Sequence, residues 1–326
     1  MFVTAYDDRV IMPDYFTPFI WNTTRFCDLH LIAPIKKLKR STKPNSKFMV
    51  QLIDPSALPK YRHTKRLFDD LFINYSTNND SFERACFHRW FAINAATTTL
   101  NSNDFICLLD TDFLIGMNPS DVLSLCQSKA ENFDIQFIAE WAGDEPVAIG
   151  PEITIMTKSY LYGFCRYLLT TYYSPPMRSQ LLVEYFDRIG NGLSGGICDM
   201  RALAAYSKLH HGKIFNLQNI EYPQIIGNLN SFLKNEIGKT DNWNICFQSD
   251  IQTLNIANES KKLIGTHFQG SSKSLMCLAY RANGNITRDI CVEHLASQKT
   301  YLRKKVNRLK YDIVRLIKCF AKKKLD

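Results

Sequence analysis

The chain has 326 residues, of which 45% are hydrophobic and 22% are charged, as in an ordinary globular protein with one large domain. No apolar run is long enough to cross a bilayer, and the N-terminus lacks the basic and apolar regions of a signal peptide, so we expect neither a membrane-spanning nor a secreted protein. The ten cysteines are scattered singly, which favours a reducing compartment, and we expect a cytoplasmic protein.

The net charge of +9 is concentrated near the C-terminus. Eleven basic and two acidic residues lie from Lys299 to Asp326, so this tail carries the whole excess and the rest of the chain is neutral. A neutral body argues against a nucleic-acid-binding protein, which usually shows a basic face on its folded domain. The sequence therefore predicts a globular part at 1–298 and a separate basic tail at 299–326.

In chain order, short apolar runs alternate with stretches of helical periodicity. The expected elements are a strand at 2–5, a helix within 11–24, strands at 29–33 and 48–53, helices at 58–73 and 81–96, a strand at 105–109, a helix at 119–128, a strand at 133–139 and a helix at 201–211. This alternation predicts an α/β fold with a largely parallel sheet. The tyrosines of the aromatic run 160–173 either pack in the core or face a sugar.

Two carboxylates, Asp110 and Asp112, follow directly on the apolar run Phe105 to Leu109. Side chains alternate along an extended chain, so residues two apart lie on the same side. Carboxylates at the carboxyl end of a buried strand suit a bound Mg²⁺ or Mn²⁺. The alternative is that both aspartates cap a turn before the helix that begins near Pro119.

A second informative stretch runs from Lys262 to Lys273, where a short apolar run ends at His267. A neutral imidazole can complete a metal shell that carboxylates begin. The loop that follows contains Gly270 and two serines, and the lysine at its end can pair with a phosphate. Upstream, the glycine-dense segment 188–200 lets a ligand approach the backbone, or is simply a tight turn.

The tail from Lys299 has an apolar stripe at helical spacing, with bases on its remaining faces. The stripe consists of Leu302, Val306, Leu309, Ile313, Leu316, Ile317 and Phe320. A basic amphipathic helix of this kind is typical of binding to an anionic membrane surface. It could instead dock on the body of the protein, or contact a partner or a nucleic acid.

The order of the two motifs, Asp110-x-Asp112 and then His267-x-x-Gly270-x-x-Lys273, resembles the glycogenin-like retaining glycosyltransferases, which include bacterial lipooligosaccharide galactosyltransferases. The resemblance implies a GT-A (Rossmann-like) mixed sheet flanked by helices, ending in a basic amphipathic helix. It also implies that Asp110, Asp112 and His267 hold Mn²⁺ (or Mg²⁺). Gly270 and Lys273 would contact the diphosphate of a nucleotide-sugar donor.

The same resemblance implies further donor contacts in three other segments. The first strand and its turn would contribute Ala5, Tyr6 and Asp8. The helix at 81–96 would contribute Arg89, and the aspartate motif Thr111. Ser194, Gly195 and Gly196 lie in a segment that matches the family's Asn-Ala-Gly near the donor sugar. Ser194 stands where the family has asparagine, so the identity of the sugar stays open.

The segment Asp250-Ile251-Gln252-Thr253-Leu254-Asn255, expected to begin or lie in a short helix, resembles the family's Asp-Gln-Asp-x-Leu-Asn. Asp250 and Gln252 are therefore candidate catalytic residues. Ile251 replaces the glutamine that lies near the reacting carbon in the family, so retention or inversion of the sugar's stereochemistry stays open.

The resulting hypothesis is a metal-dependent glycosyltransferase that moves a sugar from a nucleotide-sugar donor, expected to be a UDP-sugar, to a glycan or glycolipid acceptor. Surface polysaccharide or lipopolysaccharide synthesis at the inner face of a membrane is the expected setting, with no nucleic acid involved. Two alternatives remain: another Mg²⁺- or Mn²⁺-dependent phosphate-handling enzyme, namely a nucleotidyltransferase or a phosphatase, and a non-catalytic binding protein that acts through its basic tail.

Overall fold

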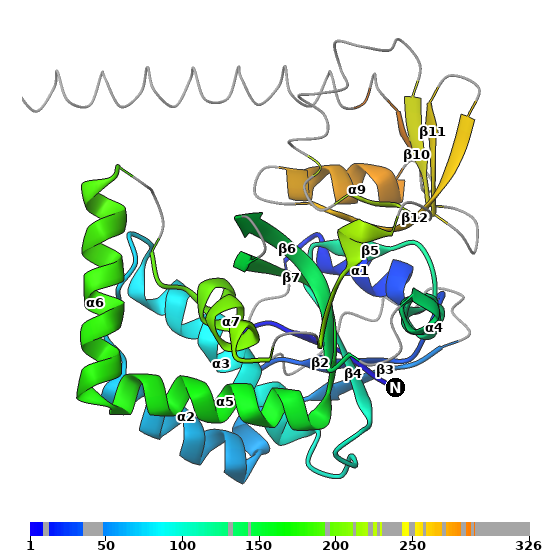
Figure 1. Ribbon diagram of the computed structural model, residues 1–326. Coiled ribbons are helices and arrows are strands. Elements are labelled where there is room, and N and C mark those ends of the chain that lie inside the picture. The colour runs from blue at the N-terminus through cyan, green and yellow to red at the C-terminus, as the bar shows by residue number, and fades with distance from the viewer. Residues whose placement is uncertain are drawn as a thin grey trace, which may run out of the picture.

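The computed structural model describes most of the first 220 residues and several shorter segments after them. The described residues are 1–8, 13–34, 48–129, 133–142, 145–192, 196–210, 213–220, 224–226, 229, 243–247, 252–256, 259–268, 272–281, 285–287 and 290. They form two sheets with helices packed around them (Figure 1). The tail at 299–326 and its expected helix lie outside these residues.

The main sheet has seven strands in the order β3-β2-β1-β4-β7-β6-β8. Their bounds in chain order are β1 Phe2–Tyr6, β2 Leu29–Ile32, β3 Val50–Ile53, β4 Phe105–Leu109, β6 Ile135–Ala142, β7 Glu145–Thr157 and β8 Ile214–Asn216. The first four are parallel, whereas β7 runs antiparallel to both β4 and β6. The expected mixed α/β sheet flanked by helices is thereby confirmed.

The smaller sheet is joined to the main one through the chain between β4 and β5. Its strands are β5 Phe113–Ile115, β9 Gln224–Ile226, β10 Trp243–Cys246, β11 Gln252–Ile256, β12 Glu259–His267 and β13 Asn285–Thr287. Their order is β13-β10-β11-β12-β5, with β9 pairing to β12. The chain thus leaves the main sheet at Leu109 and enters the smaller one at Phe113, so Asp110 and Asp112 lie at the junction of the two sheets.

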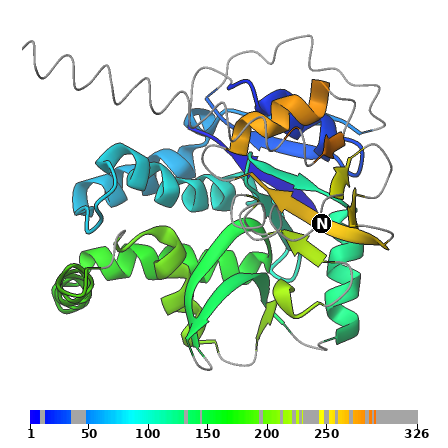
Figure 2. The same cartoon turned by 90° about the horizontal axis from the view of Figure 1, so that it is seen from above.

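Helices cover both faces of the main sheet. The described helices are α1 Phe16–Thr23, α2 Pro59–Leu71, α3 Asp80–Ala96, α4 Pro119–Lys129, α5 Lys158–Tyr173, α6 Pro175–Gly190, α7 Asp199–Lys208 and α9 Lys273–Arg281, of which α6 contacts α5 and lies away from the sheet. The helices α1 and α9 lie side by side over one face, and α2, α3 and α5 gather on the other (Figures 1 and 2). Short 3₁₀ turns at Pro55–Ala57 and Leu217–Asn219 connect some of these elements.

The two faces of the sheet carry separate hydrophobic cores, and β4 contributes to both. Cys107 and Leu109 belong to the core with α1, α4 and α9, whereas Ile106 and Leu108 belong to the core with α2, α3, α5 and α7. A strand that is buried on both faces has no polar positions to alternate with its apolar ones. This explains why β4 appears in the sequence as an unbroken apolar run.

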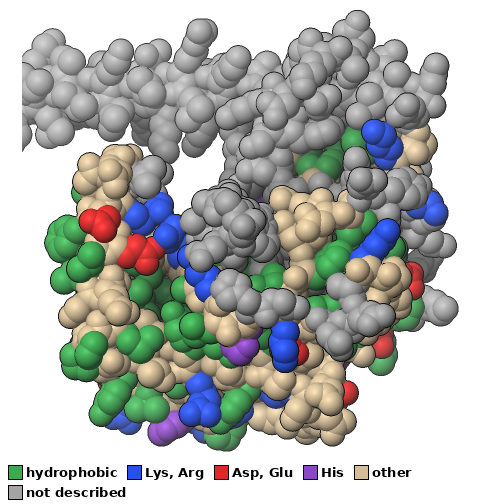
Figure 3. Space-filling view, viewed as in Figure 1, with side chains coloured by type: hydrophobic (Ala, Val, Ile, Leu, Met, Phe, Trp, Pro, Cys, Tyr) green, Lys and Arg blue, Asp and Glu red, His purple; other side chains and the backbone are tan. Residues whose placement is uncertain are grey.

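The aromatic run of α5 mainly packs. Tyr160 and Tyr172 are buried, and the ring of Tyr172 lies 5.0 Å from that of Phe68 in α2. By contrast, no side chain of α6 is buried, and hydrophobic side chains are exposed along this helix (Figure 3). No described helix is both long and apolar enough to reach across a membrane.

One predicted element is wrong. The helix expected at the segment 250–255 is instead the strand β11, which pairs antiparallel with β10 and with β12. Leu254 is buried between its neighbours, and Thr253 and Ile256 are β-branched residues that favour strands. The neighbouring strands β10 and β12 decided the conformation here, and the pattern within 250–255 alone did not contain them.

Candidate metal centre

The turn between β4 and β5 is held by one backbone hydrogen bond within it and by bonds to two neighbouring segments. The amide of Asp110 donates to the carbonyl of Glu152 on β7 at 3.0 Å, and the amide of Phe113 donates to the carbonyl of Asp110 at 3.0 Å. The amide of Phe268, just after β12, donates to the carbonyl of Asp112 at 2.8 Å. These bonds fix the backbone that carries both aspartates.

His267 reaches the same place because β12 pairs antiparallel with β5, with His267 opposite Phe113. One ligand atom from each of Asp110, Asp112 and His267 lies within 4.8 Å of the other two. Two carboxylates and an imidazole form a donor set that suits a divalent cation such as Mn²⁺ or Mg²⁺. The residues present therefore fit the metal that the sequence predicted.

The alternative, in which both aspartates cap a turn before the helix near Pro119, does not account for the contacts of their side chains. The start of α4 is capped by Asn118, whose side-chain oxygen accepts a hydrogen bond from the amide of Ser120 at 2.8 Å. Asp110 and Asp112 point instead toward groups in α3, β12 and α9.

Lys273 is the first residue of α9 and brings a positive charge to the metal ligands. Its Nζ atom lies 2.8 Å from Oδ2 of Asp112, and it lies over the ring of Tyr15, 5.1 Å from the centroid. An ammonium group beside a cation site can pair with the oxygens of a phosphate that the cation also binds.

Arg89 on α3 holds Asp110 from the opposite side. Its Nη1 atom lies 2.9 Å from Oδ1 of Asp110, and its Nε donates to Oδ2 of Asp199 at 2.9 Å. Asp199 is almost completely buried and also accepts a hydrogen bond from the indole of Trp90 at 2.9 Å. The pair formed by Arg89 and Asp199 is thus a fixed support for the first aspartate.

The protonation of the three ligands follows from these contacts. Burial raises the pKa of Asp110 to about 6, with Arg89 opposing that rise and Asp112 adding to it. Burial disfavours the charged form of Asp112, but His267 and Lys273 outweigh it and lower its pKa to about 2. Burial likewise disfavours the imidazolium of His267, but hydrogen bonds to Asp112 and Glu152 outweigh it and raise its pKa to about 10.

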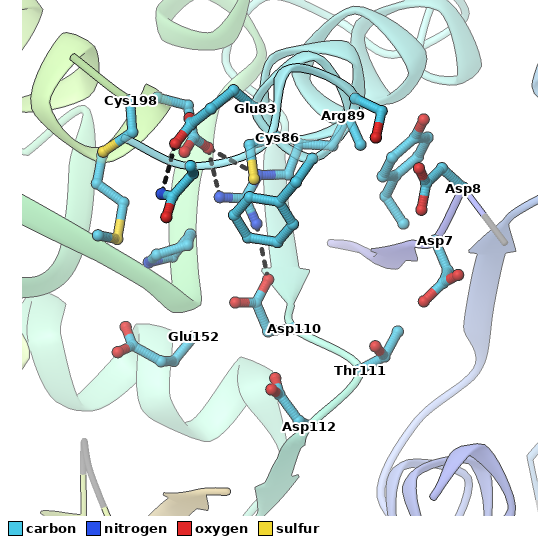
Figure 4. Close-up of a pocket in the computed structure, with 18 of the residues that line it drawn as sticks. Asp7, Asp8, Glu83, Cys86, Arg89, Asp110, Thr111, Asp112, Glu152 and Cys198 are labelled. Atoms are coloured by element: carbon cyan, nitrogen blue, oxygen red, sulfur yellow. Dashed lines mark hydrogen bonds and ion pairs between the residues drawn. The ribbon is translucent and has the colours of Figure 1, made fainter. Parts of the chain in front are cut away.

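These groups line a cavity of about 790 Å³. The sequence-predicted residues in its wall are Tyr6, Asp8, Arg89, Asp110, Thr111, Asp112, His267 and Lys273. Figure 4 shows Asp7 and Asp8 on one side of Asp110, and Glu152 and Cys198 on the other. The cavity therefore extends from the end of β1, past the metal ligands, to the start of α7.

Other sequence-predicted residues are not brought into this wall. Ala5 is completely buried within β1, and Gly196 forms an isolated bridge with Ser76. Gln252 lies on β11 opposite Leu263, four residues before His267 on the neighbouring strand. Asp250, Ser194, Gly195 and Gly270 lie outside the described residues.

Sequence reasoning missed four acidic residues of the cavity wall: Asp7, Glu83, Glu152 and Asp199. Glu83 is completely buried in α3, where it accepts hydrogen bonds from Ser76 at 2.8 Å and from Asn78 at 2.7 Å. The only signal for Glu152 is its place as a lone acid at the start of the β-branched run Ile153-Thr154-Ile155. Such an acid needs a buried partner.

No model of a known protein family matches the sequence, and no curated protein matches it. Among solved structures, the chain is similar to mouse xyloside xylosyltransferase 1 in its apo form, with a TM-score of 0.49 and 11% identity over 72% of this chain and 89% of that one. It is also similar to the galactosyltransferase LgtC in complex with donor and acceptor sugar analogs, with a TM-score of 0.37 and 9% identity over 72% and 78% of the two chains.

A third similar structure is a glycosyltransferase involved in the glycosylation of the major capsid of PBCV-1, with a TM-score of 0.39 and 11% identity over 86% of this chain and all of that one. These three solved structures are described as glycosyltransferases. The activity of this chain has to be argued from the side chains of its own cavity.

Proposed function

We propose that the protein is a metal-dependent glycosyltransferase that moves a sugar from a nucleotide-sugar donor, with a UDP-sugar as the expected donor, to a glycan or glycolipid acceptor. The observation that carries this proposal is the convergence of Asp110, Asp112 and His267 with Lys273 in one cavity. A cation site with the ammonium group of Lys273 beside it supplies two positive charges, which can bind the negatively charged oxygens of a diphosphate.

The chemistry of sugar transfer explains why these groups belong together. When the bond between sugar and phosphate breaks, the departing nucleoside diphosphate gains negative charge. A bound Mn²⁺ or Mg²⁺ supplies electrostatic stabilisation of that charge. Asp110, Asp112 and His267 would hold the cation, and Lys273 would exchange its contact with Asp112 for one with a phosphate oxygen.

We assign the two ends of the cavity to the two parts of the donor. Tyr6, Asp7 and Asp8 line it at the carboxyl end of β1, and the nucleoside would lie against them, as ligands of open α/β sheets usually do. The sugar would then extend to the other side of the metal ligands, toward the start of α7. Arg89 would keep Asp110 ionised and fixed while the sugar–phosphate bond breaks.

A thermal-shift panel of nucleotide sugars, each with and without Mn²⁺, tests this proposal. A ligand that binds only the folded state raises the melting temperature by mass action. We expect UDP-sugars to raise it only when Mn²⁺ is present, and we expect Asp110→Ala and His267→Ala to lose the shift while remaining folded. Stabilisation by nucleotide sugars that ignores both the metal and the two substitutions would contradict the proposal.

The phosphatase alternative would use Asp110 as its nucleophile. Asp110 is instead engaged by the buried guanidinium of Arg89, and Leu114 occupies the position where such enzymes usually carry threonine or valine. A covalent phospho-aspartate at Asp110 would nevertheless establish it. A nucleotidyltransferase would be recognised by release of pyrophosphate, rather than of a nucleoside diphosphate, from the bound substrate.

The setting in surface polysaccharide or lipopolysaccharide synthesis, at the inner face of a membrane, is part of the same proposal. It rests on the basic, amphipathic sequence of residues 299–326, which would keep the enzyme near a lipid-linked acceptor.

A further inference from the structure

Glu152 is a half-buried carboxylate that contacts His267 without belonging to the set of metal ligands. Its side chain is 13% exposed, and its Oε1 atom lies 3.2 Å from Nδ1 of His267. The ligand atoms that lie within reach of one common ion come from Asp110, Asp112 and His267 and from no other described residue. Glu152 therefore contacts His267 on the side of the imidazole that faces away from the metal position, and it is not itself a ligand.

The two nitrogens of His267 face two different carboxylates. Nε2 lies 3.4 Å from Oδ1 of Asp112, on the side of the ligand set, and Nδ1 faces Glu152. A metal can bind Nε2 only when the proton of the neutral ring is on Nδ1. A carboxylate that accepts a hydrogen bond from Nδ1–H selects that tautomer and fixes the plane of the ring.

We propose that Glu152 is a positioning residue for the metal centre: it accepts a hydrogen bond from Nδ1 of His267 and so aims Nε2 at the cation. This inference deepens the proposed function and rests on it for the identity of the site. It concerns how the chain prepares His267 as a ligand, and it assigns no contact between Glu152 and the substrate.

The backbone around Glu152 gives this contact a rigid base. Its carbonyl accepts the hydrogen bond from the amide of Asp110 at 3.0 Å, and β7 pairs with β4 with Ile153 opposite Leu109. The same residue thus anchors the first ligand through its backbone and the third through its side chain. Two ligands from different sheets are thereby held in one geometry.

The second carboxylate oxygen of Glu152 supports a positioning role over a role in the reaction. Oε2 is buried and has no hydrogen-bond partner among the described residues. A carboxylate that contacted the donor sugar would need an oxygen accessible from the cavity. Here the partnered oxygen is directed at His267, and the other is enclosed by protein.

A Mn²⁺ titration of the full chain, followed by electron paramagnetic resonance of the free ion, tests the inference without any turnover. Loss of a carboxylate behind a ligating histidine typically weakens metal binding by about 10- to 100-fold. We expect this loss in Glu152→Ala.

In Glu152→Gln the amide oxygen still accepts a hydrogen bond, so Mn²⁺ affinity should stay within about threefold of wild type. Glu184→Gln, which removes a remote and half-exposed carboxylate on α6, should change nothing.

The decisive comparison repeats Glu152→Ala in a His267→Ala background. If Glu152 acts through the imidazole, its removal has no further effect there, because contacts that share a partner are not additive. An equal loss in both backgrounds would make Glu152 a direct ligand and would overturn the inference. Wild-type affinity in Glu152→Ala, or a Gln variant as weak as the Ala variant, would overturn it as well.

The failure of this inference is distinguishable from failure of the proposed function. If no nucleotide sugar is turned over, the proposed function fails, although the titration still reports on Glu152. If turnover depends on Asp110 and His267 while metal affinity is indifferent to Glu152, only the inference fails.

Discussion

Asp112 accepts contacts from two cationic side chains, and these contacts determine the ionic state of the centre. His267 and Lys273 lower its pKa to about 2, and the same partnership with Asp112 and Glu152 raises the pKa of His267 to about 10. At neutral pH the metal-free protein therefore holds a protonated imidazole beside ionised carboxylates. A cation that binds Nε2 has to displace that proton.

This displacement predicts how metal affinity changes with pH. The affinity for Mn²⁺ should rise about tenfold per pH unit between about pH 6 and pH 10, the range between the pKa of Asp110 and that of His267, because one proton leaves for each ion bound. Calorimetric titrations in buffers of different ionisation enthalpy should show the release of one proton at pH 7.5. A pH-independent affinity across this range would show that His267 is no ligand.

Lys273 provides a second prediction at this scale. Replacing it by methionine should weaken binding of UDP at saturating Mn²⁺ by about 10- to 100-fold, since a hydrogen bond to a charged group is worth about 1.5–3 kcal/mol. Affinity for Mn²⁺ itself should not fall, because the lysine competes for Asp112. Isothermal titration of both ligands checks this, with the exposed Lys262→Met on β12 as the matched control. Equal losses for Mn²⁺ and UDP would contradict the assigned role.

Several site residues were predictable from the sequence because their signals are local. Asp110 and Asp112 directly follow a buried strand, and His267 and Lys273 share one short motif. Glu152 was not predictable, because its importance comes from a histidine far along the chain that only the sheet pairing brings near. The contact between Asp199 and Arg89 was likewise not predictable, because the two residues are far apart in the sequence.

The pairing of β5 with β12 is the element on which the centre depends, since it joins the strand after the aspartates to the strand that ends in His267. Gly265 on β12 makes the pairing possible. A Cβ atom there would lie 2.3 Å from Cζ of Phe113 and 2.7 Å from the carbonyl oxygen of Leu114. The backbones of the two strands approach each other closely only because this position has no side chain.

The Gly265→Ala variant should therefore be damaged in two ways. We expect a loss of about 1–3 kcal/mol in the free energy of unfolding, as for other overpacked core positions, and a weaker Mn²⁺ site because His267 lies two residues further on the same strand. Urea denaturation and the Mn²⁺ titration measure the two effects. Gly190→Ala at the end of α6, where a Cβ would meet nothing within 4 Å, is the control. An unchanged Mn²⁺ affinity in Gly265→Ala would show that the metal site does not depend on the close pairing of β5 with β12.

Elements were predictable where the local pattern carried the cause. β4 was evident because its side chains belong to both cores and so form an unbroken apolar run. α3 was evident because its apolar positions repeat at helical spacing. β11 was predicted wrongly as a helix because its strand conformation depends on β10 and β12. α6 was not anticipated, although its apolar residues Leu182, Phe186 and Ile189 recur at helical spacing.

The whole molecule combines a neutral body, which contains the site, with a tail from 299 to 326 that carries the entire net charge of +9. The two cores of the body lie on opposite faces of the main sheet, and the cavity opens where this sheet meets the smaller one. In the proposed function, catalysis belongs to the body and membrane attachment to the tail, so removal of the tail should leave the site intact.

A truncation after Ser297 tests that separation. The full chain should bind vesicles that contain anionic phospholipid and should not bind neutral phosphatidylcholine vesicles, because each basic residue near an anionic surface adds about 1 kcal/mol. The truncated protein should lose vesicle binding and keep its Mn²⁺ affinity. Salt-dependent binding of RNA or DNA by the tail, without vesicle binding, would favour the non-catalytic alternative.

The central claim is that Asp110, Asp112 and His267 together hold a cation that the transfer reaction requires. The most direct test measures release of UDP from a UDP-sugar, with Mn²⁺ or with EDTA, by the wild type and by Asp110→Ala and His267→Ala. We expect wild-type release that depends on Mn²⁺ and falls at least about 1000-fold in either variant, given the several kcal/mol that a catalytic metal supplies, while both variants retain the wild-type circular dichroism. UDP release that persists in either variant or in EDTA would contradict the claim.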